Sequence, residues 1–316
     1  MSAATKDKQP AVVITGISGN LGRTIARILH RDERVVGIDR RPFRGKPKDI
    51  ALHRLDIRRK KTGDIFRREP IKALVHMGII HDPRLSPEEH HSFNVVGTQR
   101  ILEYCVKHGV KKVIVLSSAN VYGPDPDNSN FLTEESPLRA AVRHGDVRDL
   151  VEVDMYAQSF FWRHPEVETV VLRPVHIVGP SVKNAPSNYL RLKRPWLMAG
   201  FDPNVQLIHQ EDVARAICAA LEPGVRGVFN VVGPGVAPLS RILKMLGRRS
   251  IPVPHFAAGP MLERLWKLRL TSFPPPELDH IRYLCVVDGS AFQAATGFTP
   301  SKTFLDTVLS VDGPRL

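Results

Sequence analysis

The segment TGISGNLG, residues 15–22, constrains the fold more than any other part of the chain. It places Gly16, Gly19 and Gly22 directly after the apolar run AVVIT and before NLGRTIARIL, whose apolar residues recur at helical spacing. Glycine permits a tight turn and lets backbone N–H groups approach a pyrophosphate at the start of a helix. The pattern predicts the first strand, turn and helix of a dinucleotide-binding fold. A glycine-rich turn without a ligand is the alternative.

The next apolar run, RVVGID, ends in Asp39 about 20 residues after the glycines, where dinucleotide-binding folds carry an acid. A carboxylate there accepts hydrogen bonds from the ribose hydroxyls of adenosine. Asp39 favours NAD, because it would repel the 2′-phosphate of NADP. Arg40 and Arg41 follow at once and could pair with that phosphate. We therefore predict NAD as the cofactor and keep NADP as the alternative.

Strand-like and helical segments continue to alternate along the chain, which predicts an α/β fold with a Rossmann-like doubly wound parallel sheet. After about residue 178 the pattern breaks into proline-rich loops and short helices, and LIHQEDVARAICAALEPG then returns to an amphipathic helix. We expect a dinucleotide-binding domain at 1–178, rejoined by 204–232. A small interleaved C-terminal substrate-side domain would comprise 179–203 and 233–316.

The composition indicates the cellular compartment and the class of partner that we expect. The polar start MSAATKDKQP lacks the apolar core of a secretory signal, and no apolar run reaches the roughly 20 residues of a membrane span. Three cysteines, two of them in apolar helical patterns, suit a reducing compartment, so we expect a cytoplasmic chain without disulfides. The net charge of +13 comes from scattered basic residues without interleaved aromatics, which argues against nucleic acid as a partner.

Further motifs complete a resemblance to the extended short-chain dehydrogenase/reductases, the NAD-dependent epimerase/dehydratase group. LDIRRK, LVHMGI, NVVGTQ, SSANVYG, LRPVHIVGP and IHQEDVARAI resemble successive landmarks of that family. In LDIRRK the family's adenine-binding acid would be Asp56. The glycine motif and the resemblance together give these predicted cofactor contacts: Gly16, Gly19, Asn20, Leu21, Gly22, Asp39, Arg40, Asp56, Ile57, Met77, Gly78, Asn94, Ser117 and Pro174.

The resemblance also implies a catalytic serine and a Tyr-x-x-x-Lys pair, in which the lysine lowers the pKa of the tyrosine that moves the proton. Ser118 matches the serine. Tyr156 is the only tyrosine in the expected helix, but Phe160 stands at the lysine position.

Counting helix length favours a different alignment. From Asp146 to Arg163 there are about 18 residues, roughly 27 Å of helix, which matches the depth of the sheet. From Tyr156 only about 8 residues remain, roughly 12 Å. Asp146 then occupies the tyrosine position and Leu150 the lysine position. Tyr156 would belong to an apolar packing stripe.

Two hypotheses follow. The first is a family member that is degenerate for hydride chemistry and acts by binding a nucleotide or a partner. The second is an active epimerase, dehydratase or reductase on a nucleotide-sugar-like substrate, using Ser118 with Asp146 as base. We also expect a homodimer, as is common in the family. His81, His90 and His91 with Glu88 and Glu89 could suggest a metal site. Adjacent histidines point in different directions and the segment resembles a surface loop, so we predict no metal.

Overall fold

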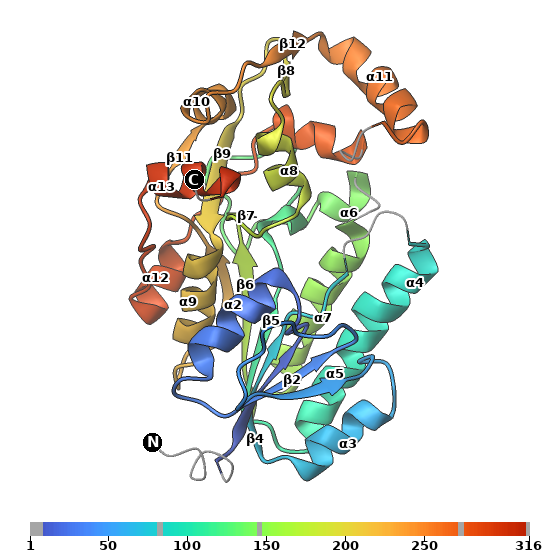
Figure 1. Cartoon of the computed structure of the whole chain (residues 1–316), viewed down its shortest axis with the longest axis vertical. Helices are drawn as coiled ribbons and strands as arrows, with labels where there is room; N and C mark the ends of the chain where they lie inside the picture. Colours follow the sequence, from blue (N-terminus) through green and yellow to red (C-terminus); the bar gives the residue numbers. More distant parts are fainter. Residues whose placement is uncertain (1–8, 81–84, 144–146, 271–274, 314–316) are drawn as a thin grey trace. The chain divides into compact units, whose positions relative to one another are not determined.

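The structure, a computed structural model, describes the whole chain except residues 1–8, 81–84, 144–146, 271–274 and 314–316 (Figure 1). It divides into two compact units. The first takes the described residues of Met1–Ser117, Arg148–Arg173 and Ala214–Phe229. The second takes those of Ser118–Val147, Pro174–Val213 and Asn230–Leu316.

The central sheet has seven strands in the order β10-β6-β5-β4-β1-β2-β3. Its strands are β1 (Ala11–Thr15), β2 (Val35–Asp39), β3 (Ala51–Arg54), β4 (Ile71–His76), β5 (Lys112–Leu116), β6 (Glu168–Pro174) and β10 (Gly227–Val231). The strand pairs from β3 through β6 are parallel. This confirms the predicted doubly wound parallel sheet. The strand order reverses between β1 and β4, which is where such folds bind ligands.

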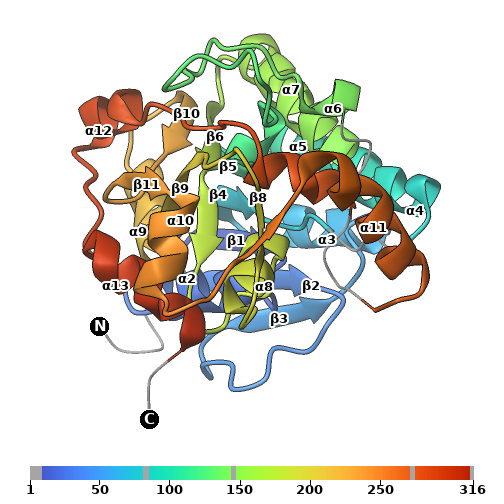
Figure 2. The same cartoon turned by 90° about the horizontal axis from the view of Figure 1, so that it is seen from above.

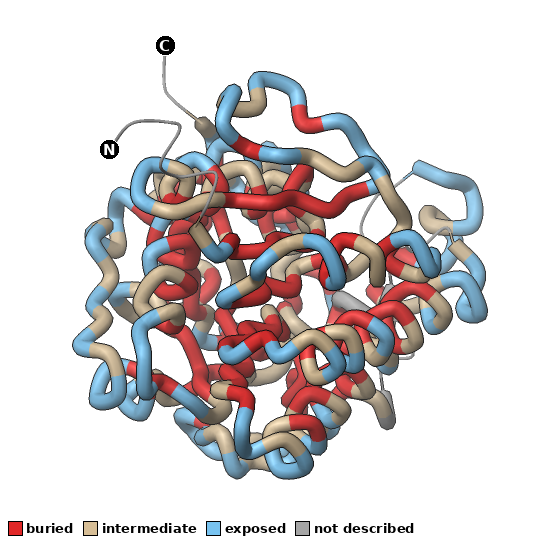
Figure 3. The backbone as a smooth tube through the Cα atoms, turned by 90° about the horizontal axis from the view of Figure 1, so that it is seen from below, coloured by how far each residue is buried: buried red, intermediate tan, exposed pale blue. Residues whose placement is uncertain are grey.

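Helices cover both faces of this sheet (Figure 2). They are α2 (Asn20–Leu29), α3 (Lys61–Arg68), the π-helix η1 (Ser92–Val96), α5 (Gly97–Lys107), α7 (Arg148–Arg163) and α9 (Gln210–Ala220). The short helix α4 (Pro87–His91) precedes η1 and has no buried residue. One core joins α3, α5 and α7 to the sheet through side chains such as Phe66, Ile101 and Phe160. The other face lies under α2 and α9. In Figure 3 the buried residues follow the strands and the inward faces of the helices.

A buried ion pair joins α7 to β6. The guanidinium of Arg173 donates to both oxygens of Asp154, at 2.7 and 2.9 Å, and neither side chain is more than 1% exposed. The hydroxyl of Ser117, just beyond β5, donates to the same carboxylate at 2.6 Å. Gln158, one turn later on α7, also donates to it at 2.8 Å. A buried charge pair is tolerated only with such full hydrogen bonding.

The second unit contains two small sheets, ordered β11-β9-β7 and β12-β8. These strands are β7 (His176–Val178), β8 (Trp196–Met198), β9 (Asn204–His209), β11 (Val236–Pro238) and β12 (Ile251–Val253). Its helices are η2 (Ala119–Val121), α6 (Ala140–Arg143), α8 (Ala185–Arg191), α10 (Leu239–Met245), α11 (His255–Lys267), η4 (Pro275–Ile281), α12 (Ser290–Thr296), α13 (Phe304–Leu309) and η5 (Ser310–Asp312). A separate apolar core includes Leu207, Ile242 and Leu262. The sequence predicted only loops and short helices in much of this region, because a strand of three residues shows no alternation.

Two expectations from composition can be compared with the structure. All three cysteines, Cys105, Cys218 and Cys285, are free thiols. Among the described residues, each helix is too short or too polar to cross a bilayer.

The buried pair generates a stability prediction. Asp154→Asn removes the buried carboxylate charge that pairs with the Arg173 guanidinium, so the free energy of unfolding should fall by about 3–5 kcal/mol. The matched control is Asp64→Asn, which breaks the exposed Asp64–Arg67 pair on α3 and should cost less than about 1 kcal/mol. Urea denaturation followed by circular dichroism measures both. Equal effects of the two substitutions would contradict this assignment.

Candidate dinucleotide-binding site

The glycine turn between β1 and α2 has no space for side chains. Gly16 has a φ of 73°, and a Cβ there would lie 2.7 Å from the carbonyl oxygen of Met77. A Cβ on Gly22 would lie 2.3 Å from the carbonyl oxygen of Gly16. The turn is closed by the N–H of Gly19, which donates to Gly16 at 3.0 Å. Gly19 caps α2 without a side-chain hydrogen bond, so the first backbone N–H groups of the helix remain available to an anion.

Asp39 at the end of β2 is held in a fixed orientation. One carboxylate oxygen accepts the backbone N–H of Ser18 at 3.0 Å, and the other accepts that of Arg41 at 2.8 Å. The Arg41 guanidinium approaches the same carboxylate at 3.3 Å, and the Asp39 side chain is 6% exposed. The sequence treated Arg41 only as a ligand for a 2′-phosphate. In the structure it is an ion-pair partner of Asp39.

Two arginine guanidinium groups lie over the ring of Phe93, and one of them, that of Arg40, directly follows Asp39 in the chain. The guanidinium of Arg40 lies 4.7 Å from the centre of the Phe93 ring, and that of Arg58 lies 5.5 Å from it. Arg58 also donates to Asp56 at 2.7 and 3.0 Å. Partial burial alone would raise the pKa of Asp56, but the hydrogen bonds and charge of Arg58 hold that pKa below its usual value. Asp56 is therefore an ionised anchor for Arg58.

A chain of buried hydrogen bonds supports the segment after β4. His76 contacts Thr15 through Nδ1 at 2.7 Å and Thr98 through Nε2 at 2.9 Å. Thr98 donates to the backbone carbonyl of Asn94 at 2.5 Å. The Asn94 side chain accepts the N–H of Ile80 at 2.8 Å and donates to its carbonyl at 3.0 Å. Asn94, predicted as a cofactor contact, thus positions the segment that follows β4.

A cavity of about 440 Å³ lies at the carboxyl ends of β1, β2 and β4. This volume is in the range of small-molecule sites. Six predicted cofactor contacts line it: Gly16, Asp39, Arg40, Ile57, Met77 and Gly78. Arg41 also lines it, and the sequence missed other lining residues, among them Leu85, Glu89 and Phe93. Phe93 directly precedes the NVVGT motif, so its position in the sequence was the available signal.

The remaining predicted contacts are not among the residues that line this cavity. Asn20, Leu21 and Gly22 form the first turn of α2. The Ser117 hydroxyl donates a hydrogen bond to Asp154 and so joins the end of β5 to α7. Pro174 is the last residue of β6.

The structure describes only some of the predicted catalytic residues. Asp146 lies outside the described residues. Leu150 is buried in α7 at 3% exposure, and the Ser118 hydroxyl caps η2 by accepting the N–H of Asn120 at 3.1 Å. Tyr156 packs against the α7 side of the core, with the Arg163 guanidinium 5.3 Å from its ring centre. Tyr122, the tyrosine of the SSANVYG segment, is buried and donates its hydroxyl to Asn230 at 2.8 Å.

Comparison with known proteins identifies the family. The family model "NAD dependent epimerase/dehydratase family" matches residues 12–232. This chain belongs to that family.

Two curated relatives indicate how far the similarity extends. An uncharacterized protein of Mycobacterium tuberculosis is 25% identical over 80% of this chain and 68% of its own length. A UDP-glucose 4-epimerase of Dictyostelium discoideum is 28% identical over 65% of this chain and 63% of its own length.

Solved structures share the fold. MoeE5 in complex with UDP-glucuronic acid and NAD has a TM-score of 0.74 at 20% identity, covering 95% of this chain and 97% of that chain. A UDP-glucose 4-epimerase of Thermus thermophilus in complex with NAD has a TM-score of 0.74 at 19% identity, covering 96% and 98%.

The close approach at the glycine turn is testable. Gly22→Ala should lower the free energy of unfolding by at least about 2 kcal/mol, because the added methyl group meets backbone and not a mobile side chain. Gly259→Ala is the control, since Gly259 also lies in a helix, α11, and an added Cβ would meet no atom within 4 Å apart from its chain neighbours. Because Pro260 follows it, the gain in helix propensity is offset in part, and stability should change by less than about 1 kcal/mol. Thermal and urea unfolding would measure both, and a tolerated Gly22→Ala would contradict the crowded turn.

Burial lowers the pKa of His76 to about 4 from an ordinary value of 6.5. The unfolded chain then binds a proton that the folded chain rejects between these values, so stability falls as pH drops from about 6.5 to 4. At about 1.4 kcal/mol per pKa unit, this one group accounts for roughly 3 kcal/mol. We expect His76→Gln to show a correspondingly shallower loss over this interval. Parallel urea titrations of both proteins at several pH values would reveal it; identical slopes would contradict the prediction.

Proposed function

We propose that this chain binds NAD(H) in the cavity at the ends of β1, β2 and β4, and that it lacks the family's tyrosine-driven hydride chemistry. One observation carries the first part. The nearly buried Asp39 carboxylate stands at the rim of a 440 Å³ cavity, held by Ser18 and Arg41 and facing the glycine turn. A ribose diol is the ligand that such a carboxylate recognises. The family membership and the NAD named for the similar solved structures support the same cofactor.

The arginines favour NAD over NADP. Arg41 is engaged with Asp39, and Arg40 lies over Phe93. A 2′-phosphate would have to approach the Asp39 carboxylate and draw at least one arginine from its present partner. We therefore expect NADP(H) to bind more weakly.

The second part rests on the residues available for proton transfer. A general acid or base needs a titratable group within hydrogen-bond reach of the substrate. Leu150 has none, and it stands at the aligned lysine position. Of the tyrosines on the aligned segments, Tyr122 donates its hydroxyl to Asn230 and Tyr156 packs against the core. Binding of the cofactor without turnover suits a sensor, a scaffold or a partner subunit, and a homodimer remains part of this proposal.

The alternative is an active enzyme. Ser118 would orient a substrate oxygen and Asp146 would accept its proton, on a nucleotide-sugar-like substrate. The observation that favours it is the family itself, in which MoeE5 was solved with UDP-glucuronic acid and NAD.

Calorimetry with NADH and NADPH tests the binding site. NADH should bind more tightly than NADPH. Asp39→Ala should weaken NADH binding at least about tenfold, because it removes charge-assisted hydrogen bonds worth about 1.5–3 kcal/mol each. Asp64→Asn, on the exposed face of α3, is the control and should leave the affinity unchanged. Failure to bind either cofactor, or a preference for NADPH, would overturn the proposal.

A panel of UDP- and dTDP-sugars, monitored by NADH absorbance and product chromatography, tests the degenerate chemistry. We expect no turnover. Turnover that Asp146→Asn abolishes and Tyr156→Phe leaves intact would sink the first hypothesis and support the alternative.

A further inference from the structure

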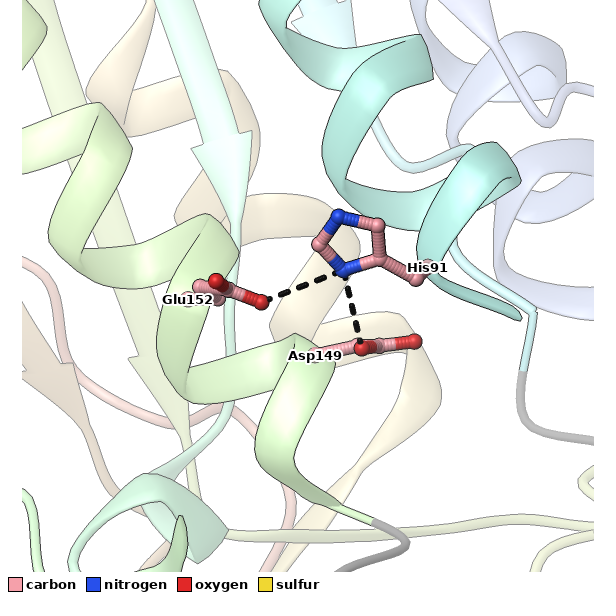
Figure 4. A group of neighbouring side chains, drawn as sticks. All are labelled: His91, Asp149 and Glu152. Carbon is pink, nitrogen blue, oxygen red and sulfur yellow. Dashed lines mark ion pairs between the residues drawn. The ribbon is translucent and has the colours of Figure 1, made fainter. Parts of the chain in front are cut away.

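A second cluster of ligand-type side chains lies in the first unit, between α4 and α7 (Figure 4). Nδ1 of His91, at the end of α4, lies 3.3 Å from a Glu152 carboxylate oxygen and 3.6 Å from an Asp149 oxygen. The three donor atoms all lie within 4.8 Å of one another. From this geometry we propose that His91, Asp149 and Glu152 bind a divalent transition-metal ion such as Zn²⁺, with water completing the coordination.

The donor spacing fits such an ion. Zinc binds imidazole nitrogen and carboxylate oxygen at about 2.0–2.2 Å, usually with tetrahedral geometry. Donors at that distance from a tetrahedral centre are separated by about 3.3–3.5 Å. The two His91 separations, 3.3 and 3.6 Å, are close to this value. The Asp149 and Glu152 oxygens lie within 4.8 Å of each other, so binding requires these two carboxylates to approach by at most about 1.5 Å.

The helix positions explain how the cluster is built. Asp149 and Glu152 stand three residues apart in the first turns of α7, so their side chains share one face. His91 comes from a different helix and closes the group from the other side. Donors that are 58 residues apart in sequence thus converge on one point.

The net charge of this group of three side chains favours the binding of a cation. Two carboxylates share a single imidazole, so the group keeps a net negative charge whether or not the histidine is protonated. Among the described residues, Asp149 and Glu152 have no other hydrogen bond or ion pair with side chains. Asp149 is only 16% exposed, so water compensates this charge poorly. One nitrogen and two oxygens form a donor set suited to zinc and its first-row neighbours.

The bound ion would link the short helix α4 to α7. α4 has five residues and none of them is buried. It continues directly into η1, whose π-helical turn carries Phe93 and Asn94. Such turns often occur at functional sites. A metal between His91 and α7 therefore restrains the segment that supports the cofactor cavity.

The experiment uses the full chain after removal of metal by a chelator. Zn²⁺ is titrated by calorimetry in competition with a chelator of known affinity, and Co²⁺ is titrated by visible absorption, which reports nitrogen and oxygen donors in a distorted tetrahedral site. We expect one ion per chain. His91→Gln, Asp149→Asn and Glu152→Gln should each weaken binding at least about tenfold, since even outer partners of metal ligands cost 10–100-fold.

His90→Gln is the matched control, because it removes the neighbouring histidine on the same helix and leaves the cluster intact. Its affinity for Zn²⁺ should equal that of the unmodified protein. Circular dichroism and urea unfolding of every variant exclude misfolding as the cause of lost binding. Hydrogen exchange should also show slower exchange of the amides around His91 when Zn²⁺ is present, in the unmodified protein and in His90→Gln.

Two results would overturn the proposal. Zinc that binds the unmodified protein and the three ligand variants equally is held elsewhere. No binding to the unmodified protein would show that His91 is only an ion-paired histidine. Neither result depends on NAD(H), so the failure of the metal site and the failure of the proposed cofactor function remain distinguishable.

Discussion

The buried pair of Asp154 and Arg173 determines how α7 lies against the sheet of the first unit. Two opposite charges removed from water need each other and a full set of hydrogen bonds, and Ser117 and Gln158 complete that set. Any rotation or sliding of α7 would separate the carboxylate from the guanidinium. The helix therefore has one orientation, and the fate of every other side chain on it follows. Leu150 lies one turn before Asp154 on the same face, and it is buried.

The same constraint bears on the tyrosine that raised the question of catalysis. Tyr156 comes two residues after Asp154, so its side chain projects about 200° further around the helix. It packs beside the apolar core that includes Val153, Ala157 and Phe160. A helix held by a buried ion pair cannot turn this ring toward the place where Asp154 points. Tyr156 therefore faces a different direction from Asp154, while the assignment of Asp146 and Leu150 to the family's tyrosine and lysine positions stays a prediction.

Much of this could be predicted from the sequence where the signal is local. Gly16, Gly19 and Gly22 define a turn whose chemistry depends on a few consecutive residues, and the buried strands of the central sheet are continuous apolar runs. The edge strand β3 was missed because ALHR is short and partly exposed. The Arg58–Phe93 contact and the convergence of His91 on α7 were missed for another reason. They depend on how distant elements pack, and a periodic pattern carries no information about which helix faces which.

The π-helix η1 links the two sites that we propose in the first unit. At one end it follows His91, and along its length Phe93 lines the cofactor cavity while Asn94 holds Ile80. Any ligand that orders η1 lowers the entropy cost of a second ligand that needs the same order. By reciprocity, a metal on His91 that raised the affinity for NAD(H) would itself be bound more tightly in the presence of NAD(H). Under the proposed function, in which the family's tyrosine and lysine are replaced, the chain would then still respond to two small ligands, and a binding role requires such a response.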